Sequence, residues 1–486
     1  MTSLAYFRQI SFWIAVDFLF GCFYTYNKVF CFLYVIIMTE NKAIMFLKYG
    51  GFLMGIDSIL SKIESWNDEM VACRRDLHKH AEPGWREYRT TAKIIKVLKE
   101  NGIPFKYGHE IINPNFLWSY PTQDVLEAHQ KRAIEQGADP EIIAEMKGFT
   151  GACAIIETGK PGKTIAIRFD IDCNDVNETN DPEHVPFKEG FASINANCMH
   201  ACGHDGHATM GLYTTLALNE IKDELCGTIK MIFQPAEEGV KGAQSIAEGG
   251  ILDDVDMFFS SHLGMGYKTG ELIGLTKDFL STTKIDATFH GVASHAGMTP
   301  QEGRSAILAA SAACLAMHTA CQDSRGASRI NVGTIHGGTG RNVVPDKAVI
   351  QVETRGKTAD IERGVYNRAM SSIEGAAQMF GCTVETAIMG SASSADSDWA
   401  LEPYIYRAQA RLPEITRYQP EDGFTGSEDA TYLMAKVQEH GGLATYMGVG
   451  ADIAAPHHNG KFNFDESALV TNVKLHTAIV WEICNE

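Results

Sequence analysis

Residues 199–238 contain the side-chain types that proteins use to bind divalent metals. Residues 199–207 read Met-His-Ala-Cys-Gly-His-Asp-Gly-His, and residues 234–238, after an apolar run, read Gln-Pro-Ala-Glu-Glu. Thiolate, imidazole and carboxylate groups are ligands of first-row divalent ions. Cys202 and His204 are two residues apart, just before a helix that we expect to begin near His207, so both can point at one position from an irregular turn. These segments predict a hydrolytic metal site.

Further candidates lie beyond this motif. Glu237 and Glu238 are adjacent and diverge in direction, so one can bind metal while the other accepts a proton from water as general base. His262 ends a predicted strand, and the pair His457-His458 lies in a loop before the last predicted helix. Singly, each has an ordinary structural explanation, such as a space-filling cysteine, a solvated acidic turn or a hydrogen-bonded core histidine. The prediction therefore depends on the whole set.

Two aspartates and two more histidines flank the cluster. Asp170 and Asp172 end the predicted strand 164–172. Carboxylates in that position can be metal ligands, or they can orient metal-bound imidazoles. We interpret His200 and His207 as structural.

The pattern of apolar segments predicts an α/β fold that brings these residues to one sheet edge. Two helices are expected in 57–102 and an exposed helical hairpin in 122–148. Strands 164–172, 227–234 and 255–263 and helix 207–221 predict a mostly parallel sheet with helices on both faces. From about residue 278 the order becomes βαββαβ, with strands 281–291, 328–336, 347–356 and 381–388 and helices 303–320 and 360–380. This is the order of a ferredoxin-like module. After residue 391, helix 428–440, strand 443–449 and helix 467–484 resume the first pattern, so residues 57–277 and 391–486 form one domain interrupted by residues 278–390.

Composition limits the classes of partner and the compartment. A chain of 486 residues is too long for one ordinary core. Its 42 basic and 60 acidic residues give a net charge of −18, which argues against nucleic acid or an anionic membrane as the main partner. The 12 cysteines have no regular spacing, which is typical of reduced thiols in a cytoplasmic protein.

The N-terminal extension, residues 1–56, differs from the rest of the chain. Residues 12–38 are aromatic and apolar, and the only charged residues among them are Asp17 and Lys28. This stretch is long enough to span a bilayer, so membrane attachment is one interpretation. The interpretation that we favour is that most of residues 1–56 is not part of the working protein, with Met38, Met45 or Met54 as the true start, because no second span follows.

The motifs together resemble the M20 family of metallo-amidohydrolases and peptidases, in the branch whose metal motif reads His-Ala-Cys-Gly-His-Asp. The resemblance runs from about Trp66 to the C-terminus and leaves residues 1–56 without a counterpart. Within the family, the insert at 106–150 and the His-His-Asn segment resemble most the enzymes that act on p-aminobenzoyl-glutamate. The matching segments are 74–78, 192–193, 199–207, 234–239, 293–297, 340–345, 353–356, 426–430 and 457–459.

The resemblance implies a role for each matching residue. Five residues would bind two divalent ions, Mn or Zn: Cys202, His204, Glu238, His262 and His458. Glu237 would be the general base, and Asp172 would support a metal-bound imidazole. His295, from the inserted lid and dimerisation domain, would stabilise the tetrahedral intermediate, often in the active site of a partner subunit. Asn342 and Arg355 would bind the free carboxylate of the substrate.

The expected function is metal-dependent hydrolysis of the amide bond of an N-acyl or N-aroyl amino acid, with p-aminobenzoyl-glutamate as first candidate. Indole-3-acetyl-aspartate hydrolysis and general aminoacylase activity are alternatives with the same fold. A non-catalytic member that binds metal or a partner is another, although Glu237 beside Glu238 argues against it. Cys202 as a nucleophile activated by His204 is disfavoured by their spacing. The expected assembly is a homodimer or a heterodimer with a related subunit.

Overall fold

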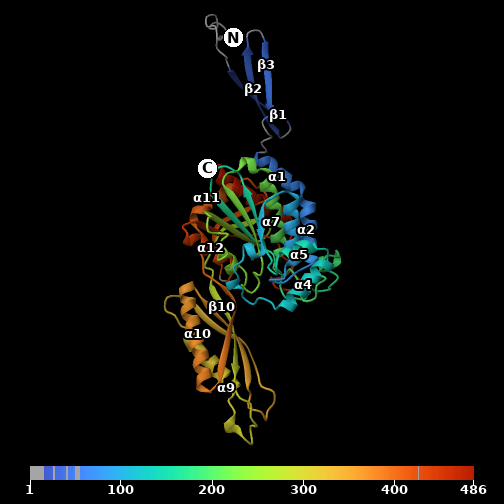
Figure 1. Cartoon of the computed structure of the whole chain (residues 1–486). Helices are drawn as coiled ribbons and strands as arrows, with labels where there is room; N and C mark the ends of the chain where they lie inside the picture. Colours follow the sequence, from blue (N-terminus) through green and yellow to red (C-terminus); the bar gives the residue numbers. More distant parts are fainter. Residues whose placement is uncertain (1–15, 26–27, 40–41, 50–54, 425) are drawn as a thin grey trace. The chain divides into compact units, whose positions relative to one another are not determined.

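The computed structural model describes residues 16–25, 28–39, 42–49, 55–424 and 426–486 (Figure 1). The chain divides into two compact units, residues 1–62 and 63–486. In the first unit, β1 (Val16–Thr25), β2 (Lys28–Thr39) and β3 (Lys42–Tyr49) form an antiparallel sheet in the order β1-β2-β3. The described part of the predicted bilayer span, 12–38, is therefore strand. Among the described residues, no helix has the length and apolar character needed to cross a membrane.

The second unit is built on an eight-stranded sheet with the order β14-β9-β15-β8-β6-β7-β5-β4. Neighbours β14 and β9, β15 and β8, β8 and β6, and β6 and β7 are parallel, so the sheet is mostly parallel, as predicted. Its strands are β4 (Phe105–Tyr107), β5 (Ala152–Glu157), β6 (Thr164–Asp170), β7 (Thr228–Gln234), β8 (Met257–Leu263), β9 (Glu271–Lys277), β14 (Arg417–Gly423) and β15 (Leu443–Val449). Strands β6, β7 and β8 are buried along nearly their whole length, which explains why their sequences are mostly apolar.

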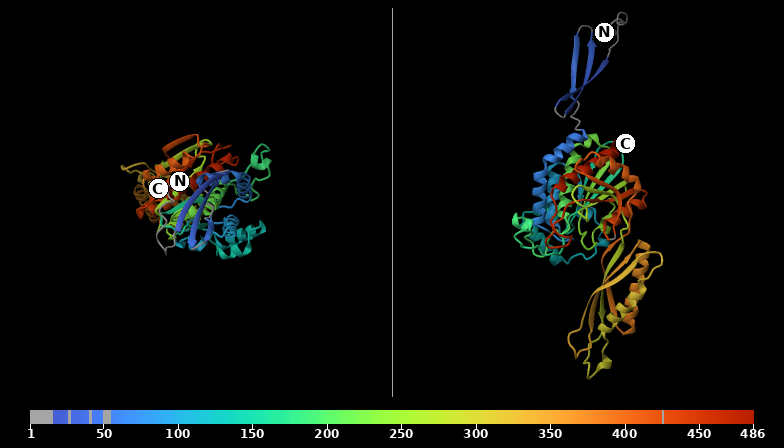
Figure 2. Two further views of the ribbon diagram at one scale, coloured as in Figure 1. Left: turned by 90° about the horizontal axis from the view of Figure 1, so that it is seen from above. Right: turned by 180° about the vertical axis from the view of Figure 1, so that it is seen from behind.

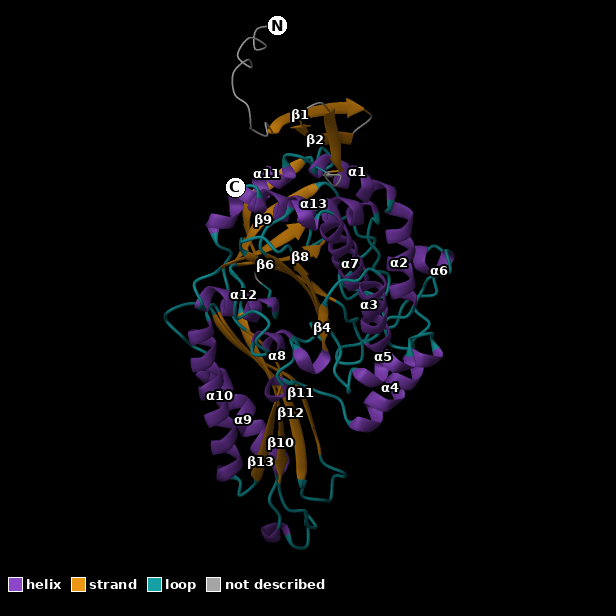
Figure 3. Ribbon diagram, turned by 45° about the horizontal axis from the view of Figure 1, so that its top comes forward, coloured by secondary structure: helices purple, strands orange, loops and turns teal. Residues whose placement is uncertain are grey.

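Helices cover both faces of this sheet (Figure 3). On one face α7 (His204–Glu220) packs on β6 and against α13 (Ser467–Cys484) and α2 (Asn67–Lys79); on the other, α12 (Ala430–Glu439) packs on β15 and against α8 (Ala243–Ala247). A core cluster that includes Phe258, Ile232 and Leu433 fills the space under α8 and α12. The remaining helices are α1 (Ile56–Ser65), α3 (Tyr88–Glu100), α4 (Gln123–Glu135), α5 (Pro140–Glu145), α6 (Val185–Lys188) and α11 (Glu402–Gln409).

An inserted module with its own core interrupts this domain, and it forms the yellow to orange lobe in Figure 2. Its elements are β10 (Ser281–His290), α9 (Ala306–Ala320), β11 (Ser328–Gly337), β12 (Lys347–Gly356), α10 (Ala359–Met379) and β13 (Thr383–Ala392). The antiparallel order β11-β12-β10-β13 is that of a ferredoxin-like sheet. Alternate residues of β10, including Ile285, Ala287 and Phe289, face the two helices, while Lys284 and Asp286 lie on the opposite face.

The structure corrects several predicted elements. Residues 57–102 form three helices, not two, and the short strands β4, β5, β9 and β14 were not predicted. Helix α7 begins at His204, three residues before the predicted start. Gly203 precedes it with φ +90°, in the left-handed region that favours glycine, and this sharp entry takes the place of the expected irregular turn.

Candidate metal centre and active site

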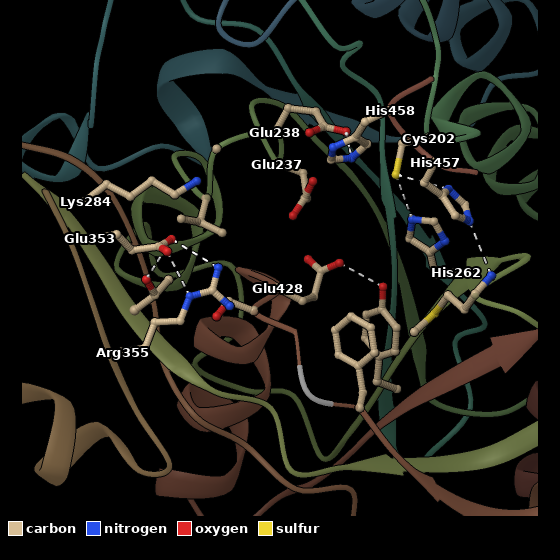
Figure 4. Close-up of a pocket in the computed structure, with 17 residues that line it drawn as sticks. Cys202, Glu237, Glu238, His262, Lys284, Glu353, Arg355, Glu428, His457 and His458 are labelled. Atoms are coloured by element: carbon tan, nitrogen blue, oxygen red, sulfur yellow. Dashed lines mark hydrogen bonds and ion pairs between the residues drawn. The ribbon is translucent and has the colours of Figure 1, made fainter. Parts of the chain in front are cut away.

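The candidate site lies at the carboxyl ends of the central parallel strands, where ligands of α/β sheets usually bind. Strand β6 leads to Asp172, β7 to Glu237 and Glu238, and β8 carries His262. A cavity of about 490 Å³ opens there and is lined by residues from the large sheet, from the loop after β15 and from the inserted module (Figure 4). The predicted clusters, distant in sequence, therefore share one pocket.

The first turn of α7 positions His204, and Cys202 lies two residues before it. The Nδ1 of His204 lies 2.9 Å from the backbone oxygen of Asp172, to which it can only donate. In the neutral imidazole its Nε2 then carries the lone pair, and this atom is buried without a hydrogen-bond partner. Burial lowers the pKa of His204, but Asp170, Asp172 and Cys202 outweigh burial and raise it well above its ordinary value, so a bound cation would have to displace a proton here. The nearest carboxylate oxygens, those of Asp170, Glu238 and Glu237, are 3.8–4.0 Å away. An unpartnered buried lone pair beside carboxylates is the arrangement expected of a metal ligand.

The glutamate pair is held by Asp172. One carboxylate oxygen of Asp172 accepts a hydrogen bond from the backbone N–H of Glu237 at 3.0 Å, and the other accepts from that of Glu238 at 2.9 Å. Ala236 and Val240, on either side of the pair, have φ of +55° and +59°, which is uncommon for residues with a side chain. This tight turn directs both carboxylates into the pocket, where Glu238 Oε1 is buried without a hydrogen-bond partner.

Histidines close the other side of the site. His262 donates from Nδ1 to the Leu263 oxygen at 2.8 Å, which leaves its Nε2 3.3 Å from the sulfur of Cys202. His457 places Nδ1 3.6 Å from the same sulfur, while His458 places Nε2 3.5 Å from Glu238 Oε1. His458 has φ +64°, a conformation that costs free energy and occurs often at functional sites.

Two groups of ligand atoms share Cys202. One comprises Cys202, His204 and His262, and the other Cys202, Glu238 and His458; within each group the ligand atoms lie within 4.8 Å of one another. A thiolate common to two such groups can bridge two ions, so these residues fit a pair of divalent cations. The five predicted ligands thus come together.

The pKa shifts identify the pocket groups that need a nearby positive charge to ionise. Burial and the neighbouring Glu238 raise the pKa of the Cys202 thiol well above its ordinary value. Burial, Glu428 and Glu238 raise the pKa of Glu237 in the same manner. Burial also lowers the pKa of His262 well below its ordinary value, which keeps its imidazole neutral. Positive charge placed among these groups would favour the thiolate and the carboxylate.

A buried polar network that the sequence analysis missed lies behind the pocket. Arg168 is fully buried and pairs with Asp170 at 2.9 Å, Glu428 at 3.0 Å and Asp429 at 3.4 Å. Glu428 lines the pocket and also accepts a hydrogen bond from the hydroxyl of Tyr446 at 2.8 Å. An arginine inside an apolar strand was the available signal, because a buried guanidinium requires acidic partners.

The two further histidines of the motif differ in their contacts. His207, interpreted as structural, donates to Asp170 at 2.5 Å and accepts from the backbone N–H of Leu263 at 3.0 Å. Both ring nitrogens are therefore satisfied within the protein. His200 is buried with no hydrogen-bond partner on either nitrogen, and burial lowers its pKa to about 3. It is neutral at ordinary pH.

Of the three residues that the resemblance assigned to the substrate or the intermediate, Arg355 lies in the pocket, and His295 and Asn342 lie outside it. Arg355 lines the pocket, but its Nε and Nη2 donate to the carboxylate of Glu353 at 2.9 and 3.2 Å. His295 and Asn342 are exposed and do not line the pocket of their own chain. The two residues lie close together in the backbone. His295 forms an isolated β-bridge with Val343, and the backbone N–H of Ala296 donates to the backbone oxygen of Asn342 at 3.0 Å.

The fold and the clustered ligands define the class of protein. Residues 166–482 match the model of peptidase family M20/M25/M40, and the chain belongs to this family, as the motifs predicted.

Within this family, the chain is similar to hydrolases of amino-acid conjugates. The chain is 46% identical to indole-3-acetyl-aspartic acid hydrolase of Enterobacter agglomerans, over 84% of this chain and 94% of that protein. It is 42% identical to one of the subunits of p-aminobenzoyl-glutamate hydrolase from Escherichia coli K12, over 86% and 95%. The crystal structure of an aminobenzoyl-glutamate utilization protein from Klebsiella pneumoniae superposes with a TM-score of 0.76 at 35% identity, over 88% of this chain and 98% of the other.

Proposed function

We propose that this protein is a metal-dependent amidohydrolase that cleaves the amide bond of N-acyl or N-aroyl amino acids. The observation that carries the proposal is the sharing of Cys202 between two ligand groups, with Glu237 beside them in the same pocket. The two similar hydrolases are named for conjugates of glutamate and of aspartate. We therefore propose p-aminobenzoyl-glutamate as the first substrate to test and indole-3-acetyl-aspartate as the second.

The proposed ligands of two ions, Zn or Mn, are Cys202, His204, Glu238, His262 and His458. A sulfur, imidazole and carboxylate set suits Zn, and the site does not exclude Mn. When bound, such ions polarise the scissile carbonyl and acidify water. His458 is preferred to His457 because His457 Nε2 accepts a hydrogen bond from the backbone N–H of Met265 at 3.3 Å and its ring packs on Phe462. His457 is thus explained by its contacts with the protein, without a role as metal ligand.

Glu237 is proposed as the general base. Its carboxylate points into the pocket beside Glu238 (Figure 4), and its backbone is held by Asp172. It would take a proton from the attacking water and return that proton to the nitrogen of the leaving amino acid as the amide bond breaks. The supporting hydrogen bonds to Asp172 keep the carboxylate in place during both transfers.

We propose that His295 and Asn342 act in the pocket of a partner, because neither lines the pocket of its own chain. His295 would stabilise the oxyanion and Asn342 would help to bind the substrate carboxylate. The partner would be a second copy of this chain or a related subunit; the Escherichia coli relative is itself named as one subunit of its hydrolase. Residues 278–390 would then serve as lid and dimerisation domain. A cytoplasmic location is supported by the ten cysteines that are free in the described residues.

Metal analysis combined with hydrolysis assays tests the proposal. The purified protein should contain about two divalent ions per chain and release glutamate from p-aminobenzoyl-glutamate, and a chelator should remove both properties. Glu237→Gln should keep its metal while turnover falls by about a hundredfold or more. Hydrolysis that survives complete removal of metal would contradict the proposal.

A further inference from the structure

The charges that line the pocket are unevenly compensated. Among its described lining residues are four carboxylates, Glu237, Glu238, Glu353 and Glu428, and only two side chains with permanent positive charge, Lys284 and Arg355. Figure 4 shows Lys284, Glu353 and Arg355 together on one side, across from Cys202 and the histidines, with the amine of Lys284 directed into the pocket. The two cations therefore lie on the wall of the pocket opposite Cys202 and the histidines.

The first cation, Arg355, is already paired. It lies two residues after Glu353 on β12, so both side chains share one face of the strand. The bidentate contact with Glu353 uses Nε and Nη2 and leaves Nη1 to other partners. The pair is electrically neutral as a whole, which limits its attraction for a second carboxylate.

The second cation, Lys284, has no such partner. It lies directly opposite Glu353 in the β10–β12 ladder, yet the carboxylate of Glu353 is turned to Arg355. Within the described parts of the chain, no carboxylate oxygen lies within 4.0 Å of its amine. The amine is part-buried at the meeting point of the main pocket and a second cavity of about 410 Å³. A lysine held in a pocket without a counter-charge attracts an anion of the ligand.

The other pocket carboxylates do not compete for this amine. Glu428 is held from behind by Arg168 and Tyr446. The carboxylates of Glu237 and Glu238 lie on the opposite wall, 3.9–4.0 Å from His204 Nε2, and that of Glu238 is also 3.5 Å from His458 Nε2. Lys284 is therefore the cation of the main pocket without an ion-pair partner among the described residues; Asp286, two residues along β10, lines the second cavity with it but forms no ion pair with it.

We propose that Lys284 binds the side-chain carboxylate of an acidic amino-acid leaving group and so selects glutamate and aspartate conjugates. This inference rests on the proposed amidohydrolase function. Such a substrate has two carboxylates: Nη1 of Arg355 is available to the α-carboxylate common to all amino acids, and Lys284 receives the one that only acidic amino acids have. The first residue supports binding in general, and the second determines specificity.

The test compares p-aminobenzoyl-glutamate with p-aminobenzoyl-glutamine, which differ only in the charge of the side-chain terminus. Lys284→Met should lower kcat/KM for the glutamate substrate by about 10- to 100-fold, mainly through KM, and leave the glutamine substrate within about twofold. Lys284→Arg should restore part of the preference. The matched control is Lys347→Met, an exposed lysine at the other end of the same ladder, which should change neither substrate.

The outcomes separate this inference from the proposed function. Equal losses for both substrates would overturn it, because Lys284 would then contact the common α-carboxylate or support the structure alone. An unchanged ratio in Lys284→Met would overturn it as well. Failure of the metal-loaded wild-type protein to hydrolyse p-aminobenzoyl-glutamate, p-aminobenzoyl-glutamine and indole-3-acetyl-aspartate would instead refute the amidohydrolase proposal. Unfolding curves of both lysine variants identify any loss that comes from misfolding.

Discussion

Replacing Asp172 by Asn tests whether the carboxylate behind the glutamate pair sets the geometry of the metal centre. Asp172 accepts one backbone hydrogen bond on each oxygen, from Glu237 at 3.0 Å and from Glu238 at 2.9 Å. An asparagine retains one acceptor and turns an NH₂ group toward the other backbone N–H. The turn therefore loses one hydrogen bond to a charged group, about 1.5–3 kcal/mol. If that cost falls on metal binding, it corresponds to an increase in the metal Kd of about 10- to 100-fold.

The assay is a competition for Zn²⁺ or Mn²⁺ against a chromogenic chelator, with wild type and Asp172→Asn compared at one pH. Asp175→Asn is the control, because Asp175 is exposed in the same loop and the substitution makes the same change in charge. Activity at saturating metal should also fall in Asp172→Asn, since Glu237 would no longer be held in position. A metal Kd within twofold of wild type would refute the reasoning.

Two further predictions concern stability. Arg168→Met should lower the free energy of unfolding by about 3–5 kcal/mol, because it leaves several buried carboxylates without their cation. Denaturant titration should show a much smaller effect for the exposed Arg417→Met, and equal effects would contradict the assignment. Partial burial favours the neutral form of Asp76, but hydrogen bonds from His80, Arg89 and Lys93 outweigh it and lower the pKa of Asp76 well below its usual range. The free energy of unfolding of wild type should therefore exceed that of Asp76→Asn by about 1 kcal/mol near pH 6. This difference should shrink as pH falls below about 4, the pKa of an unfolded aspartate. A difference in unfolding free energy that is constant from pH 6 to pH 3 would contradict this.

The sequence allowed much of the fold and of the ligand set to be predicted, because both depend on local pattern. Strands β6, β7 and β8 are mostly apolar, and the polar residues that end them must meet at one sheet edge. Cys202, His204, Glu238, His262 and His458 accordingly come together. The start of α7 was misplaced because Gly203 in a left-handed conformation begins the helix without a capping side chain.

The substrate side of the pocket was harder to predict, because it depends on pairings between strands and not on motifs. The family resemblance assigned Arg355 to the substrate carboxylate. Its contact with Glu353 arises because the two side chains, two residues apart on β12, share one face of the strand. Lys284 belongs to no recognised motif. Its position beside Glu353 in the pocket follows from the register of β10 against β12. Short strands such as β4 and β14 were missed because few apolar residues mark them.

The position of β15 has a consequence for how the chain folds during synthesis. This strand comes from the last fifty residues, yet it lies inside the large sheet between β9 and β8. The sheet therefore cannot be completed on the ribosome until residues 443–449 have emerged, whereas the inserted module, which precedes β15 and has its own apolar core, can fold earlier. Truncation near the C-terminus should for this reason leave a folded module attached to an aggregation-prone remainder.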